Sequence, residues 1–251
     1  MQANADKFQA MIVSYRPHEI DYLNLENHNI KCENHVKLLG VWLDNKLNFD
    51  KHISELCLKA SRQLNALKRL SSYLNESTKM CIYKSFILCH LNYCPLIWHF
   101  TSKSNVLKLE KLQERALRFV FSDFDSDYDA LLAQADMPSL ELSRLRQLAT
   151  EVFKAMHNLT PPFISRLFHT EGCELEGGDK TNIKLRNGHK NSTRAGLRSF
   201  TYQGTKIWNN LPTTYKNATN LTIFKRLIKT WNGHSCTCNY CRSGMYVTNC
   251  S

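Results

Sequence analysis

The chain has 251 residues, of which 43% are hydrophobic, and its formal net charge is +11. This composition is typical of a globular protein and excludes an intrinsically disordered chain, and the length accommodates one large domain or two small ones. No apolar run approaches the roughly 18 residues of a membrane-spanning helix, and residues 1–14 contain no apolar signal-peptide segment. We therefore expect an intracellular protein, cytoplasmic and nuclear, with no membrane partner. Its ten cysteines are expected to be thiols or metal ligands rather than disulfides.

The positive charge is concentrated in two of four consecutive segments. Residues 51–122 and residues 171–251 each carry 12 Lys or Arg against 4 Asp or Glu, whereas residues 1–50 and 123–170 are mildly acidic. From Lys180 onward there are 12 Lys or Arg and no acidic residue. An acid-free stretch of this length favours a polyanionic partner. The alternative is a chance excess of cations on an ordinary surface.

The first fifty residues are expected to form short strands separated by turns. Apolar runs occur at 9–14, 22–25 and 37–43, and a proline-containing turn at 16–18 separates the first run from the second. Gly40 lies inside the third run, where a glycine is typical of a β-bulge or of a close backbone approach.

The hydrophobic period changes from two to 3.6 near Asp50, which is expected to cap the N-terminus of a helix. Its apolar side consists of Ile53, Leu56, Ala60, Leu64 and Leu67. Basic residues lie on another side, namely Lys59, Arg62 and Arg69. A second helix is expected from Glu76 to about Tyr93. Because it is apolar on nearly all sides, we expect it to be the buried centre of a helical bundle.

A third helix is expected from about Asn105 to Phe121. Four basic residues at helical spacing form a stripe on one side of it: Lys108, Lys111, Arg115 and Arg118. This basic stripe is either a phosphate-binding surface or an ordinary solvated helix face, since Glu110 and Glu114 lie nearby.

The remainder of the chain is expected to be helical around one long loop. An acidic turn at 123–129 precedes a helix at 139–157. The segment 171–196 is polar and contains glycine, which predicts a loop or weak hairpin between two subdomains. Amphipathic segments follow at 199–211 and 221–231.

The acidic turn is weighed first as a metal site. A calcium loop that began at Asp123 would need Gly at its sixth position and Glu at its twelfth, and the sequence has Tyr128 and Gln134 there. A two-metal polymerase site needs aspartates from neighbouring strands, whereas this turn lies between expected helices. We therefore interpret these acids as helix caps.

The cysteine-rich tail is weighed next. Cys238 and Cys241 form a C-x2-C pair near Cys236, and His234 or Cys250 could complete a zinc site. Only one such pair is present, so free thiols are favoured over zinc. Motifs of phosphate-binding loops, zinc proteases and hydrolases do not occur in the sequence. The residue patterns alone indicate a basic, largely helical binding module.

Six stretches carry a family resemblance in the order in which they occur. They are NADK (4–7), HVKLLGVWLDNKLNFDKHI (35–53), KASRQLNAL (59–67), IYKSFILCHLNYCPLIW (82–98), KLEKLQERALRFV (108–120) and LRSFTYQGTKIWNNLP (197–212). Together they resemble the C-terminal part of a reverse transcriptase from a non-LTR, LINE-type retrotransposon of the Jockey or CR1 kind.

The resemblance implies a polymerase fragment without catalytic residues. In that family the polymerase aspartates end an upstream palm strand pair in a (F/Y)-x-D-D turn, which would precede Asn4. The fragment would therefore lack the fingers, most of the palm and every aspartate that binds Mg, so we expect it to contain no cofactor and to be inactive alone. The tail departs from the family's C-x2-C-x4-H-x4-C zinc knuckle, which argues against bound Zn.

The resemblance also assigns binding roles. Lys7 corresponds to a lysine near the phosphates of the incoming nucleotide, and residues 38–43 correspond to the primer-grip hairpin, where Gly40 would admit the primer strand. Residues 51–120 correspond to the thumb, which lies against the template-primer duplex. The expected nucleic-acid-binding residues are Lys7, Gly40, Lys59, Arg62, Arg69, Lys108, Lys111, Arg115 and Arg118.

We thus predict an α+β, predominantly α fold with a palm remnant at 1–50 and a thumb-like helical domain at 51–170. A basic C-terminal extension at 171–235, of mixed structure, and a flexible cysteine-containing tail at 236–251 are expected to follow. The expected partners are the RNA and DNA of a template-primer duplex, together with the missing palm and fingers. Two alternatives are a non-enzymatic relic or interaction scaffold, and a fragment that acts in trans with a separate catalytic palm.

Overall fold

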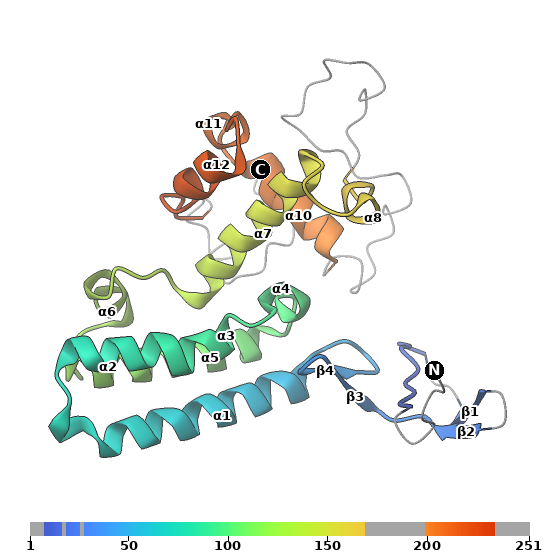
Figure 1. Cartoon of the computed structure of the whole chain (residues 1–251), viewed down its shortest axis with the longest axis horizontal. Coiled ribbons are helices and arrows are strands. Elements are labelled where there is room, and N and C mark those ends of the chain that lie inside the picture. The colour runs from blue at the N-terminus through green and yellow to red at the C-terminus, as the bar shows by residue number, and fades with distance from the viewer. Residues whose placement is uncertain (1–7, 17–18, 26–27, 169–198, 234–251) are drawn as a thin grey trace, which may run out of the picture. The chain divides into compact units, whose positions relative to one another are not determined.

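A computed structural model describes residues 8–16, 19–25, 28–168 and 199–233 of the chain (Figure 1). The chain divides into two compact units, residues 1–135 and residues 136–251. Helices dominate both, and the strands of the described residues all lie before α1, which confirms the predicted α+β, predominantly α fold class. No helix in these described ranges is both long enough and apolar enough to cross a membrane.

The strands form two separate antiparallel hairpins. β1 (Tyr22–Leu25) pairs with β2 (His28–Lys31), and β3 (His35–Leu38) pairs with β4 (Val41–Asp44). The predicted strand at 37–43 is therefore interrupted by a reversal of the chain. The two residues of that loop both have positive φ, 46° at Leu39 and 88° at Gly40, as a type I′ turn requires.

Two of the expectations for this segment are wrong in detail. Gly40 occupies the turn and not a bulge inside a strand, because its tolerance of positive φ is needed where the two strands reverse. Residues 9–14 do not form a strand, and Ala10 makes only an isolated bridge with Cys32.

Helix α1 (Asp50–Arg69) buries the predicted apolar side in full. Its N-cap is Phe49 in the left-handed region and not Asp50, which is the first helical residue. The carboxylate of Asp44 orders the approach to the helix by accepting backbone N–H groups of Lys46 and Asn48, both at 3.0 Å, and of Phe49 at 2.6 Å. Asp50 instead accepts the side-chain amide of Asn105 at 2.7 Å.

The second helix consists of three consecutive pieces, after a 3-10 turn, η2 (Ser71–Tyr73). They are α2 (Glu76–Ile82), a π-helical turn η3 (Tyr83–Leu88) and α3 (Cys89–Leu91), and a short helix α4 (Pro95–Trp98) follows. The expectation of a fully buried helix is wrong. Tyr83 and Leu91 are buried, but Phe86 is 60% exposed. Among the described residues, α1 and α5 (Lys103–Phe121) pack against one side of this helix, and the side that carries Phe86 is exposed.

Helix α5 (Lys103–Phe121) packs beside α1 and runs in the same direction (Figure 1). Their N-terminal ends are joined by the Asp50–Asn105 hydrogen bond and by Thr101, whose hydroxyl donates to the carbonyl of Asn48 at 3.0 Å. The α2–η3–α3 helix runs in the opposite direction. A short helix α6 (Tyr128–Gln134) completes the first unit.

The regular secondary structure described in the second unit consists of helices. Its helices are α7 (Leu140–Met156), α8 (Pro162–Ser165), α10 (Phe200–Asn210), α11 (Thr213–Lys216) and α12 (Leu221–Ile228). The ring of Phe153 stacks on Phe224 with centroids 4.3 Å apart, and Trp208 lies 6.3 Å from both. Because α7 packs against α10 and α12, the division between the units falls before α7 and not near residue 171, where the loop was expected.

Candidate nucleic-acid interface

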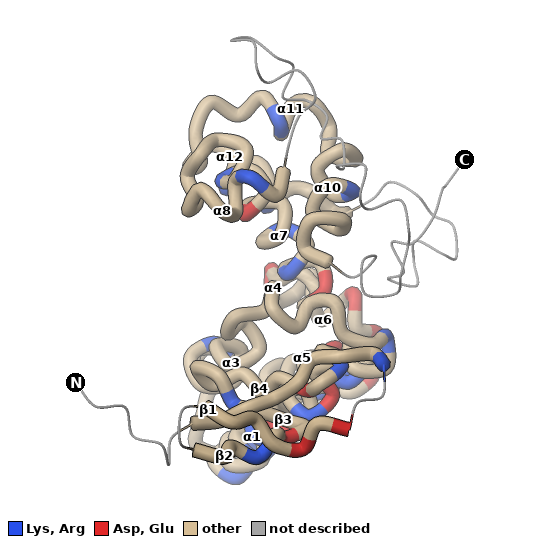
Figure 2. Tube along the Cα trace, turned by 90° about the vertical axis from the view of Figure 1, so that its right-hand side faces the viewer, with Lys and Arg blue, Asp and Glu red and all other residues tan. Residues whose placement is uncertain are grey.

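The basic stripe lies on one exposed side of α5. Lys108, Lys111 and Arg115 are exposed, whereas Leu109 and Ala116 are fully buried against the rest of the unit. The cap of the helix is Ser102, whose hydroxyl accepts the backbone N–H of Asn105, and this fixes the start of the helical register. Figure 2 shows basic residues along both α1 and α5.

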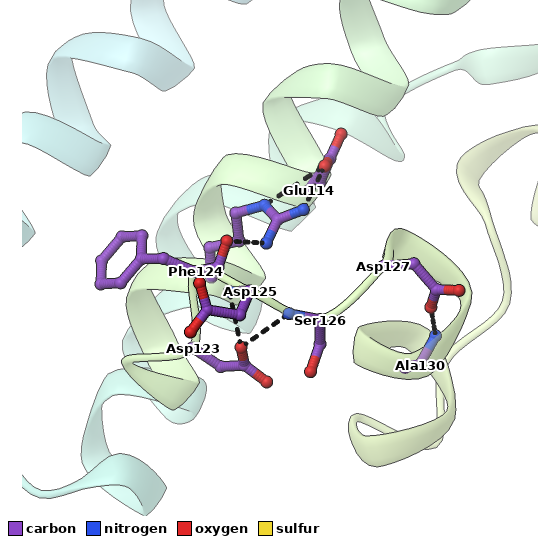
Figure 3. Close-up of polar contacts among 8 residues, drawn as sticks. Glu114, Asp123, Phe124, Asp125, Ser126, Asp127 and Ala130 are labelled. Carbon is purple, nitrogen blue, oxygen red and sulfur yellow. Dashed lines mark hydrogen bonds and ion pairs between the residues drawn. The ribbon is translucent and has the colours of Figure 1, made fainter.

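Arg118, the fourth member of the stripe, is held by local partners. Its guanidinium contacts one carboxylate oxygen of Glu114 through Nη2 at 2.8 Å and Nε at 3.2 Å, and its Nη1 donates to the carbonyl of Phe124 at 2.8 Å (Figure 3). Arg118 therefore ties the end of α5 to the acidic turn. Three stripe residues rather than four present an exposed charge.

The acidic turn is organised by its own backbone. Asp123 accepts the backbone N–H of Asp125 at 3.1 Å and of Ser126 at 3.0 Å. Hydrogen bonding by the side chain of Ser126, and then by its backbone N–H, holds the pKa of Asp123 below its usual value. Asp127 caps α6 by accepting the N–H of Ala130 at 2.8 Å (Figure 3). The interpretation of these acids as caps is confirmed for Asp127. Within the described ranges, no group of three or more His, Cys, Asp or Glu side chains is placed to hold a metal ion.

Lys59 of α1 does not join the basic stripe. Burial raises the pKa of the Cys57 thiol while the charges of Lys108 and Arg115 oppose that rise, so the stripe flanks Cys57. Lys59 lies near His90, whose pKa is lowered by burial and then by the Lys59 charge. Cys57 and Lys59 project about 200° apart around the helix. The stripe and Lys59 therefore lie on opposite flanks of α1.

Sequence reasoning missed Lys68. It is exposed, and it follows Cys57 by eleven residues, which returns it to the same side of α1. It therefore extends the flank on which the basic stripe lies. The helical period alone could not have selected it, because the choice depends on which side of α1 contacts α5. The other predicted residues of α1, Arg62 and Arg69, are exposed and face away from the buried side.

The β3–β4 turn is clamped from outside the hairpin. The hydroxyl of Tyr93 donates to the carbonyl of Leu39 at 2.8 Å, and a Cβ atom at Gly40 would lie 3.6 Å from the Tyr93 ring. Leu39 itself is 83% exposed at the tip. The structure thus presents the segment expected to approach a primer as a fixed and accessible turn.

Several predicted features lie outside the described residues. Lys7 is among them, as are the loop at 171–196 and the tail at 236–251. Part of the acid-free stretch is described. There Lys216 is buried and donates to the carbonyl of Asn209 at 3.0 Å, so it supports the fold of the second unit.

Comparison with known proteins gives partial matches. The chain is 29% identical over 133 residues to an uncharacterized protein of Caenorhabditis elegans, a match that covers 50% of the chain and 63% of that protein. It is 28% identical over 99 residues to the probable RNA-directed DNA polymerase from transposon X-element of Drosophila melanogaster, covering 38% of the chain. It is also 28% identical over 101 residues to the corresponding protein from transposon BS, covering 39% of the chain.

Each Drosophila match spans 11% of the polymerase, so the chain corresponds to a small part of those proteins. No protein-family model matches the chain, and no solved structure matches it. Over somewhat more than a third of its length, the chain is thus similar in sequence to RNA-directed DNA polymerases of transposons, which supports a relationship to reverse transcriptases.

Proposed function

We propose that the chain corresponds to the end of the palm, the thumb and the C-terminal extension of a non-LTR retrotransposon reverse transcriptase, and that it binds template-primer duplexes without polymerising alone. The observation that carries this proposal is the exposed row Lys108, Lys111 and Arg115 on α5. None of the three forms an ion pair within the described part of the chain. Their charges are therefore available to a polyanion.

The spacing of this row suits a nucleic-acid strand. At about 1.5 Å per residue, Lys108 and Arg115 are separated by roughly 10 Å along α5, which is about the rise of three nucleotides along the axis of a duplex. Phosphate contacts of this kind position a protein without reading the base sequence. Binding through α5 is therefore proposed to be independent of sequence and sensitive to salt.

The chain is proposed to lack polymerase activity by itself. No two aspartates are adjacent anywhere in the 251 residues, so the (F/Y)-x-D-D turn of the family does not occur. The Mg ions of the reaction would be bound by the palm of the parent polymerase. The cysteines of the tail are not proposed to bind zinc. A polymerase palm and fingers are the proposed protein partners, alongside RNA and DNA.

Duplex binding is tested by measuring affinity for an RNA/DNA duplex against salt concentration. We expect Lys108→Gln, Lys111→Gln and Arg115→Gln together to reduce affinity at low salt about 10- to 100-fold and to lower the salt slope by roughly three. The matched control removes three exposed lysines that lie off the stripe, by Lys46→Gln, Lys84→Gln and Lys103→Gln. Absence of binding at low salt, or affinity that does not fall as salt rises, would contradict the proposal.

A second candidate function is an interaction scaffold. It is favoured by large apolar side chains that the α2–η3–α3 helix and the segment after it leave exposed, with Phe86 at 60% and Tyr93 and Ile97 each at 49%. Poor solubility without nucleic-acid binding would support it. A fragment that acts in trans would instead co-purify with a partner that restores primer extension, and extension by the purified chain alone would contradict the proposed inactivity.

A further inference from the structure

A second cationic cluster surrounds Trp42 at the junction of the β3–β4 hairpin and α1. Lys37 and Trp42 are directly opposite in the hairpin, so their side chains project from the same face. The Nζ of Lys37 lies 5.6 Å from the centroid of the Trp42 ring, and the Nζ of Lys51, in the first turn of α1, lies 3.8 Å from it. Lys37 is exposed, and both Trp42 and Lys51 are half-buried.

The acidic side chains nearest in sequence to this cluster do not pair with its lysines. Asp44 accepts three backbone N–H groups, and Asp50 accepts the amide of Asn105. Glu55, one turn after Lys51, is exposed and does not pair with it. Within the described part of the chain, neither Lys37 nor Lys51 forms an ion pair.

The remaining neighbour adds no negative charge. His52 is buried, and burial together with the charge of Lys37 lowers its pKa, which favours the neutral ring. A cation–π contact holds an ammonium group against a ring but does not neutralise it. Lys51 also lies at the N-terminal end of α1, where the helix macrodipole is positive. Lys37 and Lys51 therefore both place an ammonium group near the Trp42 ring, and no acidic side chain of the described residues pairs with either. An anion bound at this place would be attracted by both charges.

We propose that Lys37 and Lys51, held against Trp42, bind a phosphate group of a nucleic-acid backbone. This contact is separate from the basic stripe of α5, and it rests on the proposed function, which it deepens. A backbone phosphate is favoured over a free anion because Lys51 begins the segment 51–122, which carries 12 Lys or Arg against 4 Asp or Glu. An ammonium group acts as a point charge and reads no base, which agrees with binding that is independent of sequence.

The test measures duplex affinity against salt for Lys37→Gln, Lys51→Gln and the double variant. Each single change is expected to weaken binding at low salt about three- to tenfold and to lower the salt slope by about one. The matched control is Lys46→Gln, which removes an exposed lysine in the turn that follows β4 and is not at the ring. Lys37→Arg and Lys51→Arg, which keep the charge, are expected to retain binding, and thermal unfolding is compared for every variant.

A second measurement reports the site directly. Reaction of Lys37 and Lys51 with an amine-specific reagent, read by mass spectrometry, should be suppressed by the duplex. It should not be suppressed by inorganic phosphate at the same phosphate concentration. Equal protection by inorganic phosphate would overturn the assignment to a nucleic-acid backbone, as would the absence of protection by the duplex.

The outcomes separate this inference from the proposed function. If the α5 triple variant weakens binding and the Lys37 and Lys51 variants bind as the unaltered chain does, the inference is wrong and the proposed function stands. If instead the Lys37 and Lys51 variants weaken binding and the α5 triple variant binds as the unaltered chain does, the inference is supported and the basic stripe does not belong to the interface. If the unaltered chain does not bind at low salt, both are wrong.

Discussion

At the scale of single residues, the junction between the β3–β4 hairpin and α1 depends on buried polar side chains. Asp44 is 8% exposed, and its carboxylate accepts three backbone N–H groups just before the helix. Beside it, His52 is 6% exposed, and its Nδ1 lies 3.5 Å from the backbone nitrogen of Trp42. Both side chains orient the lysines around Trp42 by fixing the backbone that carries them.

The buried His52 makes stability depend on pH. Its pKa is lowered in the folded chain, so the unfolded chain binds more protons as the pH falls. The contribution of the neutral ring is present above the unfolded pKa of about 6.5 and is lost as pH falls toward the folded pKa. The free energy of unfolding, measured by urea titration, should therefore decrease between pH 7.5 and pH 5.

His52→Gln should reduce this pH dependence, although the lowered pKa of His90 leaves part of it in place. The matched variant His28→Gln, on the exposed strand β2, should keep the slope of the unaltered chain. Equal slopes for His52→Gln and the unaltered chain would show that His52 is not the group responsible.

At the scale of elements, close helix packing in the second unit depends on one glycine. Gly204 lies in α10, and a Cβ atom there would come within 2.9 Å of Val152 Cγ2 on α7 and 3.0 Å of the Phe168 ring. Alanine is the better helix former by roughly 1 kcal/mol. Contacts this short nevertheless require the neighbouring side chains to move, and overpacking of this kind costs about 1–3 kcal/mol.

We therefore expect Gly204→Ala to lower the free energy of unfolding by about 1–2 kcal/mol despite its helix propensity. Combining it with Val152→Ala, which removes the nearest methyl groups, should cost less than the sum of the two single changes. Thermal and urea unfolding of all four proteins measure this coupling. A Gly204→Ala variant with a higher free energy of unfolding than the unaltered chain would show that Val152 and Phe168 move aside without destabilising the fold.

At the scale of the whole molecule, each unit has its own core. Ile53, Leu64 and Leu109 are buried in the first unit, and Phe153 and Phe224 are buried in the second. Residues 1–135 and residues 136–251, expressed separately, should each unfold cooperatively in urea. Tryptophan fluorescence reports both, since Trp42 and Trp98 lie in the first unit and Trp208 and Trp231 in the second. A fragment without a cooperative transition would show that it needs the other for stability.

Local patterns in the sequence determined most elements correctly. The apolar period predicted the buried side of α1 residue by residue, from Ile53 to Leu67, because a helix places residues three and four apart on one side whatever it packs against. The same reasoning located α5 and α7 within two residues, and it identified Asp127 as part of a capping turn. These features depend on neighbours in the chain, and a sequence displays them directly.

What only the tertiary structure decided involves residues far apart in the chain. Tyr93 reaches the turn at Leu39 across 54 positions, and Phe86 is exposed because no element among the described residues covers its side of the second helix. Whether Lys59 and Lys68 join the basic stripe depends on which flank of α1 meets α5. The sequence by itself determined that the chain is basic, largely helical and similar to reverse transcriptases. Which cations form one surface was decided by packing, because helix spacing specifies the sides of a helix but not its neighbours.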